Sequence, residues 1–146
     1  MTGSKGPIRA YRLQIDPILE DLETSLHRLG DADMKIAGDL QHAEESGDSI
    51  MPVGVLYLEV FKTLRDRIEK SKNEMSSLSP PPSLRVFQAI YVKALDTCLE
   101  SVSYRIEACE HIVKGDSAEA EKALRQVKPL TDEFKRIEEE ALKNME

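Results

Sequence analysis

The sequence predicts an all-α fold, an antiparallel up-and-down four-helix bundle made by a single domain of residues 1–146. Apolar residues recur at helical spacing through four long stretches, and short connections with glycine or proline separate these stretches. Apolar residues make up 40% of the chain and charged residues 32%, a balance that suits helices with one buried and one solvated face. Four such helices bury their apolar faces when they pack as a bundle.

The first helix is expected over about residues 8–45. An apolar stripe with a repeat of seven residues indicates it: Ile8, Ile15, Leu22, Leu29 and Ile36. Pro17 follows Asp16, a favourable N-cap residue, so we expect the regular helix to begin there with the preceding turns kinked away. Gly47 is expected to end the helix.

The second helix is expected over about residues 52–78, and Pro80, Pro81 and Pro82 prevent its continuation. The three prolines fit poorly as a recognition motif, because a PxxP ligand needs spaced prolines. They also fit poorly as a linker between domains, since either half of the chain alone would leave its apolar stripe exposed. We therefore interpret them as the corner between two helical hairpins.

The third helix is expected over about residues 83–114, and its apolar arc is wider than the ~100° that one buried face requires. Val92, Leu99 and Ile106 form a row within this arc that something must cover, because exposed apolar patches are unusual on soluble monomers. The segment before Pro17 could cover the row and leave a monomer. We expect instead a two-fold homodimer in which the third helices of two copies meet along this row.

The fourth helix is expected over about residues 117–144, after a Gly-Asp-Ser turn. Its apolar residues alternate steps of three and four, as in the apolar stripe of a coiled coil: Ala120, Ala123, Val127, Leu130, Phe134, Ile137 and Ala141. Pro129 lies between these positions and is expected to bend the helix without ending the pattern. Phe134 and Val127 are expected to be buried.

Three charged residues interrupt apolar rows of the expected helices: Asp33, Arg67 and Arg105. Counted along the helix axes, Asp33 and Arg67 lie at a similar depth in the bundle, and Arg105 lies roughly one to two turns nearer one end. An unpaired charge inside a bundle is costly, so we predict that Asp33 pairs with at least one of the two arginines. The alternative is that the arginines extend from the edge of their stripes into solvent.

The composition disfavours several classes of function. The formal net charge of −7 disfavours binding to DNA or to anionic membranes. No apolar run approaches the ~20 residues that a membrane span needs. The first residues lack the apolar region of a secretory signal, so a cytoplasmic location is expected, and an extracellular one only if the chain has been trimmed.

Motifs for metal or cofactor chemistry are missing from the sequence. Asp39-x-x-His42 is a single, incomplete match to the Glu-x-x-His motif of di-iron bundles, so neither a metal nor a cofactor is expected. Cys98 and Cys109 lie about 16 Å apart along one helix, which is too far for a disulfide. We interpret them as small buried thiols.

The segment RIEACEH, from Arg105 to His111, has an Arg-x(4–6)-His spacing. In this spacing it resembles the HEPN-domain ribonucleases, which are small helical bundles that often dimerise. The resemblance implies that Arg105 would stabilise charge and that His111 would act as acid and base on an RNA phosphodiester. Ile106 departs from the family pattern, in which a polar residue usually follows the arginine.

A second resemblance rests on PPPSLRVFQAIYVKALDTCLESV, which begins at Pro80, and on the Gly-Asp pair that follows at 115–116. This pattern resembles that of uncharacterised prokaryotic helical proteins and covers roughly residues 80–125. It implies a bundle without implying an activity.

The sequence therefore favours a non-enzymatic interaction or scaffold module that binds a protein partner or a second copy of itself. The first alternative is a HEPN-like nuclease or toxin-type bundle with Arg105 and His111 as its catalytic pair, the only case in which RNA is a partner. The second alternative is a bundle that binds a small ligand in its core.

Overall fold

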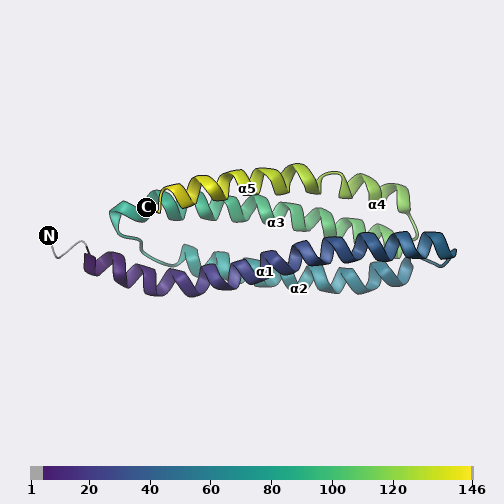
Figure 1. Cartoon of the computed structure of the whole chain (residues 1–146), viewed down its shortest axis with the longest axis horizontal. Helices are drawn as coiled ribbons and strands as arrows, with labels where there is room; N and C mark the ends of the chain where they lie inside the picture. The colour runs from purple at the N-terminus through teal and green to yellow at the C-terminus, as the bar shows by residue number, and fades with distance from the viewer. Residues whose placement is uncertain (1–4, 146) are drawn as a thin grey trace.

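The computed structural model describes residues 5–145 and shows an all-α four-helix bundle (Figure 1). One layer holds the first hairpin of two long helices, and the other layer holds a long helix followed by two shorter ones. The predicted domain of residues 1–146 includes residues 1–4 and 146, which lie outside the described part. The helices are α1 (Lys5–Ser46), α2 (Met51–Ser76), α3 (Arg85–Val113), α4 (Ser117–Leu124) and α5 (Val127–Lys143), with a short 3-10 turn, Pro82–Leu84, before α3.

A single hydrophobic core runs along the bundle between the two layers. The seven-residue stripe of α1 faces this core, and the apolar faces of the other helices close over it. The side chains that are completely buried include Ile15 and Leu22 of α1, Ile68 of α2 and Leu95 of α3. The predicted fold class is confirmed.

Both hairpins turn at a glycine with a positive φ, in agreement with the predicted helix end at Gly47 and the predicted turn before the fourth helix. Gly47 has φ 72° and Gly115 has φ 76°, a left-handed conformation that glycine adopts without a steric penalty. The amide of the following aspartate then donates to a carbonyl five residues earlier: Asp48 to Ala43 and Asp116 to His111. These bonds satisfy carbonyls at the ends of α1 and α3.

The three prolines join the two hairpins as a corner, and polar contacts hold this corner to α1. The Tyr11 hydroxyl donates to Gln88 Oε1 at 2.7 Å, and Gln88 Nε2 donates to the Leu78 carbonyl at 3.1 Å. Gln88 therefore connects the first turns of α1, the start of α3 and the segment that leaves α2.

α1 runs without interruption through Pro17, so the expectation that its regular part begins there was wrong. Pro17 lies on the solvent side of the helix, and so does Leu13, whose carbonyl would otherwise receive the missing N–H bond. Water can solvate that carbonyl, so the helix continues. Asp16 lies beside Arg12, with Oδ1 3.4 Å from Nε, and does not cap a helix.

The fourth helix is broken at Arg125 and Gln126, so the prediction of one continuous helix over 117–144 was wrong. Pro129 cannot donate to the Arg125 carbonyl, and its ring would clash with that carbonyl. The chain therefore leaves the helix one turn before the proline and does not bend at the proline itself. Phe134 is buried as predicted, whereas Val127, next to the break, is only half-buried.

The apolar row of Val92, Leu99 and Ile106 lies against α2 of the same chain. Asp96 lies on the same side of α3, four residues after Val92 and three before Leu99, and it pairs with Lys72 of α2. Ile106 is buried, and Val92 and Leu99 are half-buried against the core. The row needs no second copy to cover it, so the reason for expecting a homodimer through it no longer applies.

α2 and α3 lie very close together at Gly54. A Cβ added at Gly54 would lie 2.8 Å from Ile112 Cγ2 and 2.9 Å from the backbone nitrogen of Val113. We expect Gly54→Ala to lower the free energy of unfolding by about 1–3 kcal/mol through overpacking, although alanine is the better helix former. A denaturant titration measures this change.

Gly38 of α1 provides the matched control, because no atom lies within 4 Å of a Cβ added there. We expect Gly38→Ala to raise the free energy of unfolding by roughly 0.5–1 kcal/mol, since alanine removes conformational freedom from the unfolded chain. If both substitutions stabilise the protein equally, the close contact between α2 and α3 at Gly54 is contradicted.

Candidate functional site

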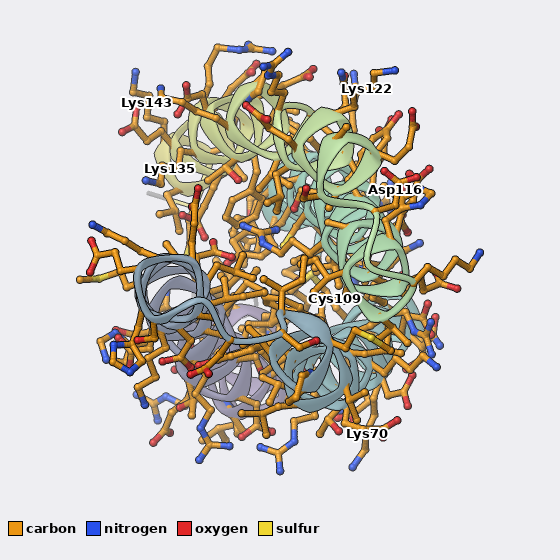
Figure 2. The ribbon with its side chains drawn as sticks, turned by 90° about the vertical axis from the view of Figure 1, so that its right-hand side faces the viewer. Lys70, Cys109, Asp116, Lys122, Lys135 and Lys143 are labelled. Carbon is orange, nitrogen blue, oxygen red and sulfur yellow. The ribbon has the colours of Figure 1, made fainter. Side chains whose placement is uncertain are left out.

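One side of the bundle is less closely packed than the others. α1 approaches α2, and α3 approaches α2, α4 and α5, but no comparable approach joins α1 to α4 or α5 within residues 5–145. Two hollows lie on this side: one of about 450 Å³ between α1 and α5, and one of about 650 Å³ between the end of α1 and α4. We call this side the seam. Figure 2 shows Lys135 on the side of α5 that faces α1.

Arg105 of α3 lies at the floor of the first hollow and is only 2% exposed although it is charged. Its Nε donates to Asp33 Oδ1 and its Nη2 to Asp33 Oδ2, both at 2.8 Å. Nη1 donates to Ser101 Oγ at 2.7 Å, and Nη2 lies 3.4 Å from Thr131 Oγ1. The two-pronged contact with Asp33 suits the planar guanidinium, and it provides the ion pair that the sequence predicted for Asp33.

Arg67 does not join this cluster. It is exposed on the outer side of α2, where it lines a different groove together with Arg28 of α1. Arg67 continues an apolar row of α2, but it lies at the edge of the buried stripe, so its long side chain reaches solvent. Of the three predicted members of the cluster, the structure therefore brings together Asp33 and Arg105 only.

The walls of the seam are apolar and its rim is charged. Leu26 and Leu29 of α1 and Phe134 of α5 line the first hollow, and Met34 lies at its rim with 77% of its surface exposed. Apolar residues from α1, α3, α4 and the turn before α2 form the second hollow: Leu40, Ile50, Ile112, Ala120 and Leu124. Each ionisable residue lining the second hollow is acidic, namely Glu44, Asp48 and Glu121.

Burial keeps two titratable side chains of α3, Cys98 and Tyr91, protonated. Burial raises the pKa of the Cys98 thiol to about 11, although the nearby Arg105 charge partly opposes this. Burial also raises the pKa of Tyr91, and the carboxylate of Glu138, which accepts a bond from the Tyr91 hydroxyl at 2.9 Å, raises it further. Neither group supplies a nucleophile or base near pH 7. The cluster is suited to binding and to holding helices together.

His111 is directed away from Arg105. Six residues of helix place the two side chains about 9 Å apart along α3 and roughly 120° apart around it. The charged neighbour of His111 is Glu107, with Nε2 3.9 Å from Oε1, while the Arg105 guanidinium is held by Asp33 inside the bundle. Within one chain, the structure does not bring Arg105 and His111 into a common site.

The described part of the chain contains no group of three His, Cys, Asp or Glu side chains placed to hold a metal ion. None of the helices within residues 5–145 combines the length and the apolar character that crossing a membrane requires. Cys98 and Cys109 are both buried and free, as predicted.

Comparisons with family models, with curated proteins and with solved structures found no match to this chain. The candidate site therefore rests on geometry. Sequence reasoning missed the seam itself, and it also missed Ser101 and Thr131. A signal for Ser101 was available, since it lies one helical turn before Arg105 on the face of α3 that also carries Cys98 and Ala108.

Proposed function

We propose that this bundle is a non-enzymatic interaction module that binds one helix of a protein partner in the seam. The observation that supports the proposal is that α1 does not pack closely against α4 or α5, which leaves two apolar hollows between the hairpins. An amphipathic helix that places its apolar face in a groove is a common mode of recognition between proteins.

The spacing of the two hollows fits a helix better than a small ligand. The first hollow is lined by α1 residues around Gly30 and the second by residues around Glu44, which are about 20 Å apart along the helix axis. A partner helix of about four turns would span this distance with one apolar side chain in each hollow. Arg105 already has its acceptors, so the occupant mainly needs apolar groups.

Met34 provides the test of this proposal, because it is exposed and lies at the rim of the first hollow. Helix-forming peptides are selected from a display library on the wild-type protein, and their affinities are measured by fluorescence anisotropy. We expect Met34→Asp to weaken binding of the selected amphipathic peptides by about tenfold or more, equivalent to about 1.4 kcal/mol.

Leu13→Asp is the matched control. Leu13 lies on the same helix, is 73% exposed and lines neither hollow, so its substitution is expected to leave peptide affinity unchanged. Peptides that bind the Met34→Asp variant as tightly as the wild type would contradict a site in the seam, and so would a selection that yields no binder.

A further inference from the structure

A separate groove lies on the outer face of the first hairpin, between α1 and α2, with a volume of about 480 Å³. We call it the outer groove. Its floor is apolar and consists of Ala32, Leu56, Tyr57, Val60 and Leu64. Leu56 is 56% exposed, and Val60, one helical turn later on the same face, is half-buried. Large apolar side chains that are exposed side by side often mark a binding surface.

The outer groove is formed by a fixed pair of helices. The hydroxyl of Tyr57, in its floor, donates to Asp39 Oδ2 of α1 at 2.6 Å. Burial and the Asp39 carboxylate raise the pKa of Tyr57 to about 12, so the hydroxyl keeps its proton and the bond persists at neutral pH. A partner would therefore meet a surface that is already in place.

Three basic and two acidic residues line the outer groove, a small basic excess on a chain whose net charge is −7. They are Arg28, Lys35, Arg67, Asp31 and Glu59. Among the described residues, no ion pair includes Arg28, Lys35 or Arg67. Asp31 already faces His27, with Oδ2 3.5 Å from Nε2. Three positive charges are thus free to meet carboxylates of a partner.

We propose that the outer groove binds an acidic amphipathic helix of a protein partner. Arg28 and Lys35 are seven residues apart on α1, about 10.5 Å along its axis. A partner helix with carboxylates seven residues apart would meet both, and its apolar side chains would contact Leu56 and Val60. Opposite charges at the rim of an interface accelerate association and fix the partner's register.

The two proposed sites are distinct, although Asp31 lies between them. The seam lies between α1 and α5 and its second hollow has an acidic rim, whereas the outer groove lies between α1 and α2 and has a basic excess. A module with both sites would hold two partners of different charge on opposite sides of α1. This arrangement gives the chain the role of a bridge between proteins.

The test uses two synthetic helical peptides with the same apolar face. One carries glutamates at two positions seven residues apart, and the other carries lysines there. Fluorescence anisotropy with the full chain is expected to show binding of the glutamate peptide that weakens as salt is raised, and at least about tenfold weaker binding of the lysine peptide. Equal affinities for the two peptides, or no binding of the glutamate peptide, would overturn the proposal.

Variants then locate the binding site. The double variant Arg28→Glu/Lys35→Glu is expected to bind the lysine peptide more tightly than the glutamate peptide. The control is Lys93→Glu/Arg136→Glu, which makes the same change in charge at exposed residues elsewhere. This control is expected to keep the preference for the glutamate peptide. Leu56→Asp is expected to abolish binding, with circular dichroism confirming that the helices remain. Met34→Asp is expected to leave binding unchanged, which separates this site from the seam.

A second copy of the chain is the competing occupant. Sedimentation equilibrium at micromolar concentration is expected to show a monomer for both the wild type and Leu56→Asp. A dimer that Leu56→Asp dissociates would assign the outer groove to self-association and overturn the proposal. Retention of glutamate-peptide binding in the Arg28→Glu/Lys35→Glu variant would overturn it as well.

Discussion

Phe134→Ala is expected to lower the free energy of unfolding by about 3–5 kcal/mol. Phe134 is 7% exposed, belongs to the core and forms a wall of the first hollow of the seam, between α5 and the rest of the bundle. Its truncation removes apolar contacts and extends the hollow into the core. Because domains of this size are stable by about 5–15 kcal/mol, the loss is a large share of the total.

A denaturant titration of Phe134→Ala measures this loss, and Leu142→Ala is its control. Leu142 is a large apolar residue of the same helix that is exposed, so its truncation is expected to change the free energy of unfolding by less than about 0.5 kcal/mol. A loss below about 1 kcal/mol for Phe134→Ala would mean that α5 does not pack through this side chain.

Asp33→Ala is expected to lower the free energy of unfolding by about 3 kcal/mol, because it leaves the buried Arg105 guanidinium without its counter-charge. The value lies at the lower end of the range for breaking a buried pair, since the Asp33 side chain is 38% exposed and water can partly replace it. Ser101 and Thr131 would remain as acceptors but carry no charge.

Replacing both Asp33 and Arg105 separates the free-energy cost of leaving one charge unpaired from the net contribution of the ion pair to stability. Asp33→Leu with Arg105→Met is expected to be as stable as the wild type or more stable, because apolar residues of similar volume avoid the desolvation of two ions. Thermal and denaturant unfolding of the single and double variants measure this. A double variant that is no more stable than Asp33→Ala would contradict the explanation.

The sequence predicts the architecture well because helix periodicity and chain-breaking residues are local signals. The stripe that includes Ile15 and Leu22 faces the core, and the hairpins turn at Gly47 and Gly115. Proline is harder to interpret, since its effect depends on which side of the helix faces water. Pro17 lies on the solvent side and does not interrupt α1, whereas one turn before Pro129 the chain leaves the helix.

The candidate site was predicted in part. Asp33 and Arg105 could be paired from the sequence, because charges within apolar rows need partners. Arg67 satisfied the same criterion but lies at the edge of its stripe, and periodicity does not show how far a stripe extends around a helix. The seam could not be predicted, because it depends on the separation of α1 and α5, which are distant in the sequence.

The length of α1 has a consequence for how the chain can be divided. Counted back along the antiparallel hairpin from Ser46 and Met51, the end of α2 at Ser76 lies opposite Asp21, so residues 5–20 of α1 extend beyond α2. Tyr11, in this extension, is buried and donates to Gln88, 77 residues later. The first half of the chain therefore contains a surface that only the second half completes. A cut in the proline corner would not yield two independent hairpins, and the protein must be produced and studied as one unit.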